Sequence, residues 1–183
     1  MIRGLHHNAW RCSDSEATRQ FYEDFLGLRL VNALRIETTQ TGRAVRALHT
    51  FYAMGDGSCL AFFEVPDQPF AFTRQHDFDL HIALEVDHLS LEDMTGRARA
   101  EGRELRGPVD HGFIRSIYLR DPDGYVVELA ARLSGHAAAM DPEKTRPHAT
   151  LLAWQAAKAA AAAPAGSAAH GKRGRTHRLP RRR

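Results

Sequence analysis

The sequence predicts an α+β fold in which two βαβββ modules form an eight-stranded half-open barrel with its helices on the outside. First, the order strand, helix and three strands occurs twice, at about residues 5–66 and 79–131. Second, a histidine leads the opening strand of each module, at His7 and His81. Third, neither set of strands is large enough to close alone. We therefore expect one curved sheet whose concave face forms a pocket.

The first module begins at residues 7–14, a short segment whose alternating character predicts a strand. A helix should follow over residues 15–26, because Ser13 and Glu16 fit a capping box and Gly27 fits a C-terminal stop. Strand-like segments complete the module, at residues 29–37, 43–53 and 58–65.

The second module repeats this order at nearly the same spacing. Residues 81–87 predict a strand, and a helix over residues 91–100 should stop at Gly102. Three further strands are expected at residues 104–108, 114–119 and 125–130. The turn between the last two is Asp-Pro-Asp-Gly, at residues 121–124, in which proline fixes φ and glycine is free to take a positive φ.

The chain should divide into a barrel domain over residues 1–133, a loop and helix over 134–159, and a disordered tail over 160–183 that is Ala-rich and then basic. In the C-terminal helix, Leu151 and Trp154 are expected to dock on the domain or on a second subunit.

The net charge of +3 comes from the tail, because residues 172–183 hold seven of the 25 Lys and Arg and no acid. The remaining 18 basic residues face 22 acidic ones, a net charge of −4. We therefore expect no specific nucleic-acid partner. No apolar run reaches membrane length and the N-terminus lacks the apolar core of a signal peptide, so a cytoplasmic protein with Cys12 and Cys59 as thiols is expected.

Residues 109–128 carry the most chemistry. His111, Tyr118 and Glu128 fall on two neighbouring strands, and a tight hairpin would place Tyr118 near Glu128. Apolar neighbours make a carboxylate costly unless it is paired or bound to a metal. Glu128 is therefore a candidate metal ligand, with His7 and His81 as its candidate partners.

A fourth ligand depends on strand parity. If the modules superimpose, Gly57 corresponds to Gly124 and the counterpart of Glu128 is Ala61. Glu64 is the nearby acid, but its offset from Gly57 has the opposite parity, so its side chain should face away unless a β-bulge intervenes. Two imidazoles and one carboxylate with open positions are typical of non-haem Fe(II) oxygenases. A further carboxylate would instead suit a Lewis-acid metal.

These residues resemble the vicinal oxygen chelate superfamily, which includes glyoxalase I, fosfomycin and bleomycin resistance proteins and extradiol ring-cleaving dioxygenases. The resemblance covers about residues 5–131 and includes the segment Phe-Tyr-Glu-Asp-Phe-Leu-Gly at 21–27 and Asp-Pro-Asp-Gly-Tyr-Val-Val-Glu at 121–128. Residues 109–128 are similar to the extradiol dioxygenase signature in particular. Many extradiol enzymes carry two more modules, so this chain is expected to resemble only their catalytic half or a smaller one-domain type.

The resemblance implies Fe(II) ligands at His7, His81 and Glu128, with Zn, Ni or Mn as alternative metals. His6 should face away from this site. Tyr118 would hydrogen-bond a substrate oxygen, and His111 would lie close to the same oxygen.

The family also uses a histidine as acid or base, for which His76 is the first assignment and His49 the second. The apolar wall of the pocket would come from Trp10, Phe51, Phe62 and Phe113.

The function expected from the resemblance is extradiol-type cleavage of a catechol-like aromatic diol by dioxygen, in a homodimer. One alternative is a glyoxalase I-type lyase or isomerase that uses Glu64 as a further ligand and Zn or Ni. Another is a non-catalytic small-molecule binding protein of the resistance type.

Overall fold

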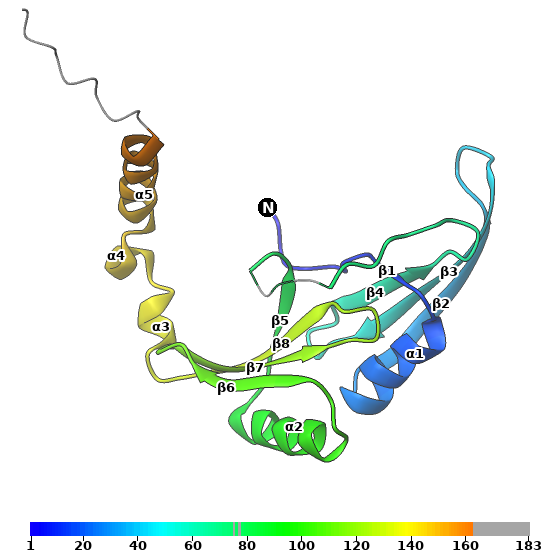
Figure 1. Ribbon diagram of the computed structural model, residues 1–183, viewed down its shortest axis with the longest axis horizontal. Helices are drawn as coiled ribbons and strands as arrows, with labels where there is room; N and C mark the ends of the chain where they lie inside the picture. The colour runs from blue at the N-terminus through cyan, green and yellow to red at the C-terminus, as the bar shows by residue number, and fades with distance from the viewer. Residues whose placement is uncertain (75, 77, 163–183) are drawn as a thin grey trace, which may run out of the picture. The chain divides into compact units, whose positions relative to one another are not determined.

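A computed structural model describes residues 1–74, 76 and 78–162 of the chain (Figure 1). It contains two compact units, Met1–Ala139 and a C-terminal unit that begins at Met140. No helix in the described ranges is long and apolar enough to cross a membrane.

The first module has the predicted order of elements, with a helix between its first and second strands. Its sheet has the strand order β1-β4-β3-β2, in which β1 pairs with β4 in parallel and the other neighbours are antiparallel. The elements are β1 (Trp10–Cys12), α1 (Ser15–Arg19), the π-helical segment η1 (Gln20–Phe25), β2 (Arg29–Thr38), β3 (Ala44–Ala53) and β4 (Cys59–Glu64).

The start of the first helix differs from the predicted capping box. Asp14, not Ser13, is the N-cap, and its side chain accepts hydrogen bonds from the backbone N–H groups of Glu16 and Ala17. Asp14 has the extended backbone that an N-cap requires. The predicted stop is confirmed, because Gly27 has a φ of +82°.

The second module repeats the first, with the strand order β5-β8-β7-β6. Its helix begins three residues before the predicted start, because Asp87 caps it by accepting a hydrogen bond from the N–H of Ser90. The elements are β5 (His81–Glu85), α2 (His88–Ala100), β6 (Leu105–Asp110), β7 (Ile114–Arg120) and β8 (Val126–Arg132).

The α+β class and the two modules are confirmed, but the strands form two four-stranded sheets and not one eight-stranded sheet (Figure 1). Strands β1 and β5 each lie at a sheet edge. Within the described residues of a single chain, no strand of one module pairs with a strand of the other, so the half-open barrel is not closed by strand pairing.

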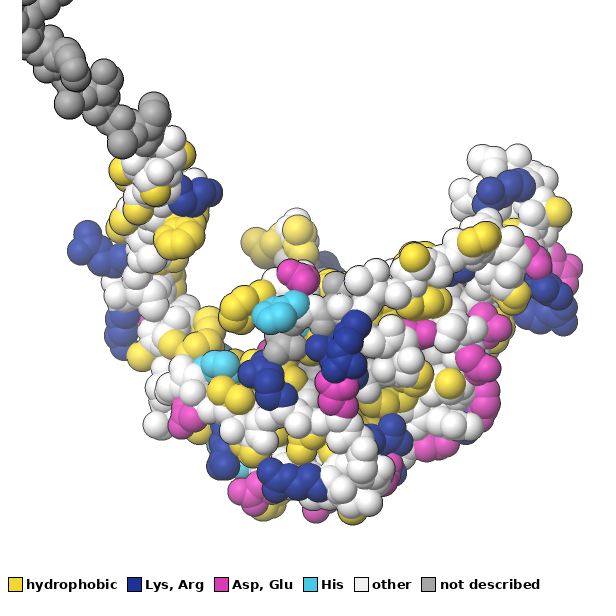
Figure 2. All heavy atoms as spheres, in the orientation of Figure 1, with side chains coloured by type: hydrophobic (Ala, Val, Ile, Leu, Met, Phe, Trp, Pro, Cys, Tyr) yellow, Lys and Arg dark blue, Asp and Glu magenta, His cyan; other side chains and the backbone are white. Residues whose placement is uncertain are grey.

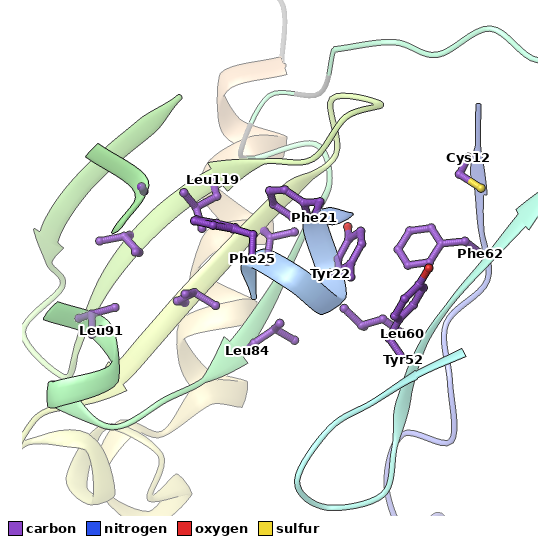
Figure 3. Packing of buried hydrophobic residues seen from close by; sticks show 14 of the residues in the cluster. Cys12, Phe21, Tyr22, Phe25, Tyr52, Leu60, Phe62, Leu84, Leu91 and Leu119 are labelled. Atoms are coloured by element: carbon purple, nitrogen blue, oxygen red, sulfur yellow. The ribbon is translucent and has the colours of Figure 1, made fainter. Parts of the chain in front are cut away.

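One hydrophobic core joins the two modules (Figure 3). Phe21, Tyr22 and Phe25, from η1, are at most 2% exposed and lie among side chains of both sheets. The Tyr22 hydroxyl also donates a hydrogen bond of 3.0 Å to the Asp121 carboxylate, in the turn between β7 and β8. Because Trp10 stacks on Tyr125 near the same turn, that turn is held against the first module.

A short helix, α3 (His136–Ala139), ends the first unit. The C-terminal unit contains α4 (Pro142–Thr145) and α5 (Pro147–Ala162), and none of the residues in these two helices is buried. The expected disordered tail falls almost entirely on residues 163–183, which lie outside the described residues.

Candidate metal centre

Glu128 and His81 form a pair on the second sheet. Glu128 lies on β8, is 4% exposed, and its Oε2 is 3.2 Å from Nε2 of His81. The pairing of β5 with β8 sets Ala83 opposite Glu128, and His81 lies two residues before Ala83, on the same face of the sheet. A buried carboxylate beside an imidazole nitrogen is a suitable pair of ligands for a divalent metal.

Tyr118 lies next to this pair. It is opposite Glu128 in the β7–β8 ladder, and its hydroxyl is 3.0 Å from Nε2 of His111. Burial raises the pKa of Tyr118, and the negative charge of Glu128 raises it further, while Arg106 opposes the shift. The phenol therefore stays protonated at neutral pH and can donate a hydrogen bond.

Arg106 is a functional candidate that sequence reasoning missed. It is opposite Tyr118 in the β6–β7 ladder, and its guanidinium carbon lies 3.9 Å from the centre of the Tyr118 ring. This contact combines a cation–π interaction with a fixed positive charge beside the candidate site. The predicted strand at residues 104–108 contained the signal, but the ladder register needed to place Arg106 depends on a bulge that follows it.

His76 lines a cavity of about 250 Å³ together with Arg106 and Tyr118. The first assignment for the acid or base therefore lies in the same cavity as the candidate hydrogen-bond donor. His49, the second assignment, lies in the first module, where its Nδ1 is 3.0 Å from the carbonyl oxygen of Phe62.

His7 belongs to a separate group on the first sheet. It forms an isolated bridge with Cys59, and its ring lies 6.0 Å from that of His49 and 5.4 Å from that of Phe51. His6, which was expected to face away, has its Nδ1 2.7 Å from Nδ1 of His7.

Glu64 faces away from this group, as its parity predicts. Its Oε2 accepts a hydrogen bond of 2.8 Å from the backbone N–H of Ser15, at the start of α1. Ala61, the counterpart of Glu128, lies on the opposite face of the same strand. The structure therefore gives Glu64 a role in holding the helix.

The expected apolar wall is present only in part. Phe51 lies beside His7, but Phe62 is fully buried in the core with Tyr22 and Tyr52, on the other face of β4. The placement of Phe62 was wrong because its neighbours in the sheet were not known. The two remaining aromatics contact other residues: Trp10 stacks on Tyr125, and Phe113 contacts His136.

The candidate residues therefore form two separate groups in one chain, called here the candidate half-sites: His81 with Glu128, Tyr118 and His111 on the second sheet, and His7 with His49 on the first. Among residues 1–74, 76 and 78–162, no three His, Cys, Asp or Glu side chains lie close enough together to hold one metal ion. The set of His7, His81 and Glu128 is not assembled within a single chain and stays a prediction.

Comparison with known proteins gives a consistent result for the first unit. Residues 4–129 match the family model described as Glyoxalase/Bleomycin resistance protein/Dioxygenase superfamily. A lactoylglutathione lyase from Neisseria meningitidis is 31% identical over 136 residues, covering 72% of this chain and 92% of the relative.

Solved structures share the fold at lower identity. A glyoxalase/dioxygenase from Nostoc punctiforme has a TM-score of 0.56 and 24% identity, covering 72% of this chain and 92% of that chain. The fosfomycin resistance protein FosX from Listeria monocytogenes, in a complex with Mn(II) and a sulfate ion, has a TM-score of 0.54 and 22% identity, covering 75% of this chain and 99% of that chain. A mutant of the same FosX, in a complex with Mn(II) and a dihydroxypropylphosphonic acid, has a TM-score of 0.55.

Proposed function

Because this chain belongs to the Glyoxalase/Bleomycin resistance protein/Dioxygenase superfamily, we propose that it is a divalent-metal-dependent enzyme of the lactoylglutathione lyase type. The observation that carries the proposal is the buried Glu128 carboxylate, 3.2 Å from Nε2 of His81. The Neisseria relative supports lyase chemistry over cleavage of an aromatic diol. The proposed substrate is a small molecule with two neighbouring oxygens, such as the glutathione hemithioacetal from which a lactoylglutathione lyase forms its product.

The second half-site supplies the polar groups of the reaction. A metal held by His81 and Glu128 would polarise a substrate oxygen and so acidify the adjacent C–H bond. Tyr118 donates a hydrogen bond to the substrate oxygen, and His111 orients its hydroxyl, a contribution of typically ~10²–10⁴-fold in rate. His76 moves the proton, because it lines the cavity that Tyr118 lines.

The third ligand comes from a second copy of the chain. His7 lies in one candidate half-site, and His81 with Glu128 lies in the other. In an isologous dimer, His7 of each chain would meet His81 and Glu128 of the second chain. Two such contacts related by the two-fold axis would give two complete sites per dimer. This arrangement also explains why β1 and β5 are left as edge strands in one chain.

Extradiol cleavage with Fe(II) is the second candidate function. It is favoured by the hydrogen-bonded pair of Tyr118 and His111 and by the position of Glu64, which leaves three protein ligands and open positions on the metal. The glyoxalase alternative with Glu64 as a fourth ligand is therefore weakened, although lyase chemistry with three protein ligands is not.

Metal-reconstituted protein distinguishes the two functions. The protein is loaded anaerobically with Fe(II), and separately with Ni, Zn or Mn. The loaded protein should convert the hemithioacetal of methylglyoxal and glutathione to lactoylglutathione. It should not consume oxygen when catechols are added. Oxygen uptake with a yellow ring-opened product, and no turnover of the hemithioacetal, would reverse the ranking. Tyr118→Phe should reduce turnover while metal content is unchanged.

Mixing two inactive variants tests the shared site. His7→Ala and His81→Ala should each lose metal binding alone. When the two variants are mixed one to one, unfolded and refolded together, half of the dimers should contain one chain of each variant. Each of these mixed dimers has one intact site out of two, so about a quarter of all sites should regain the metal. If each site were built within one chain, mixing would restore no metal binding. Glu64→Gln, unfolded and refolded by the same procedure, serves as the control and should lose no metal binding.

A further inference from the structure

An apolar groove runs between the two modules on the side of strand β5. It has a volume of about 1030 Å³, and its apolar lining comes from α2 and from both modules. Leu26, Leu28, Met54, Val86 and Met94 are half-buried there. Methionine side chains adapt their shape to different partners, so a groove that contains two of them is suited to binding the surface of another protein segment.

Acidic side chains line the groove at the start of α2. Glu85 and Asp87 are already engaged, with Arg132 and with the N–H of Ser90. Glu92 and Asp93 also line the groove and have no ion-pair partner within the described part of the chain. An occupant with an apolar surface and positive charges would therefore match it.

Helix α5 has these properties. Leu151 and Trp154 are 55% and 63% exposed, and no residue of the helix is buried. Leu151, Trp154 and Lys158 follow a helical spacing of three and four residues, which places them on one face. Arg146 lies just before the helix, so basic residues flank the apolar pair on both sides. Figure 2 shows hydrophobic and basic side chains together along α4 and α5.

An isolated helix of this length is only marginally stable in water, even when it is rich in alanine. Packing of its apolar face would supply the missing stabilisation. The 16 residues of α5 extend about 24 Å, enough to lie along a groove of this size.

We propose that α5 of one copy docks in the groove between the modules of a second copy, in a reciprocal arm exchange. The path of the chain after β8 favours docking of α5 in the groove of a second copy over docking in the groove of its own chain. After β8, the N–H of Leu133 bonds to the carbonyl oxygen of Phe113 and the ring of His136 contacts Phe113, so the chain leaves beside the β6–β7 turn. Strand β6 is the edge opposite β5, which borders the groove.

Charge reversal in the full-length protein tests this contact. One variant carries Glu92→Lys and Asp93→Lys in the groove, and the other carries Arg146→Glu and Lys158→Glu around α5. The readout is the quenching of Trp154 fluorescence by acrylamide, with the stacked Trp10 as a constant background. In the wild-type chain, Trp154 should become shielded as protein concentration rises. Each variant alone should need at least about 30-fold more protein for the same shielding.

A mixture of the two variants identifies the owner of the groove. In a mixed dimer, one contact pairs two unaltered surfaces and the other pairs two reversed surfaces, so shielding should return to the wild-type concentration. If α5 docked in the groove of its own chain, shielding would not depend on concentration and mixing would restore nothing. If Trp154 stayed equally accessible in every sample, the contact would not exist.

Two controls complete the experiment. Glu37→Lys, on the β2–β3 hairpin away from the groove, should leave the shielding unchanged. Thermal unfolding shows that each variant is folded, and Leu151→Ala provides a second disruption of the α5 contact, read by the same quenching of Trp154 fluorescence. The metal content of His7→Ala tests the shared metal site, and the shielding of Trp154 tests the arm exchange. Because the two measurements are separate, either proposal can fail while the other stands.

Discussion

Replacing Asp121 by asparagine should remove a pH dependence of folding stability that the wild-type chain has between pH 3.8 and about 6. Asp121 is 6% exposed, and burial is the main reason that its pKa rises from 3.8 to about 6. Its Oδ1 accepts hydrogen bonds from the backbone N–H groups of Asp123 and Tyr125, and its Oδ2 accepts a hydrogen bond from the hydroxyl of Tyr22. These hydrogen bonds hold the turn between β7 and β8 against the first module.

The sign and size of the effect follow from proton linkage. Between the two pKa values the folded chain binds more protons than the unfolded chain, so this group makes the free energy of unfolding fall as pH rises. The rise of the pKa from 3.8 to about 6 corresponds to about 3 kcal/mol, lost progressively over that pH range. Asparagine keeps an oxygen for the backbone N–H groups and an amide toward Tyr22, but it does not ionise.

Urea denaturation at about pH 4 and about pH 7.5 measures the effect, with the m value as a check on two-state unfolding. Relative to the wild type, Asp121→Asn should gain about 2.4 kcal/mol between the lower and the higher pH, because a small part of the full effect is already lost at pH 4, and this difference cancels the titration of all other groups. A stability difference that does not change with pH would refute the assigned pKa shift. Tyr22→Phe should destabilise the chain by about 1–3 kcal/mol, because it leaves a buried carboxylate oxygen without its donor.

Two further substitutions and one labelling experiment test other features of the structure. Glu64→Gln should lower the free energy of unfolding by about 1 kcal/mol in a thermal melt and leave metal content unchanged, since the side chain holds the start of α1. Gly107→Ala should destabilise the chain by about 2 kcal/mol or more in urea, because φ is +109° and a Cβ would lie 2.7 Å from the carbonyl oxygen of Ser116. Burial raises the pKa of the Cys12 thiol to about 11, so at pH 8 a thiol reagent should react quickly with Cys59 and with Cys12 only after denaturation; equal rates would contradict this.

Local patterns predicted several features of the structure correctly. The two modules and the stop at Gly27 follow from residue spacing and from the conformations that glycine allows. Strand parity placed Glu64 on the face opposite the pocket, and its carboxylate is in fact bonded to the start of α1. Parity works here because consecutive side chains on one strand point to opposite faces, whatever the strand pairs with.

The predictions that failed depended on which surfaces meet. Phe62 was assigned to the pocket wall, but it lies in the core because helix α1 and the segment η1 cover that face of the sheet. Arg106 was missed because its place over Tyr118 depends on the register of two strands. Asp14 replaced Ser13 as the N-cap because the backbone there is extended one residue later than predicted.

The sequence alone determined the two-module order, the facing of side chains along each strand, and the chemical types in each half-site, because these follow from short-range spacing. Only the tertiary structure decided that the two sheets stay separate within one chain and that His7 lies apart from His81 and Glu128, in the part of the chain that the structure describes. The physical reason is that edge pairing is a long-range contact, set by how the shared core of both modules packs around α1 and η1, and no residue pattern within one module encodes that packing.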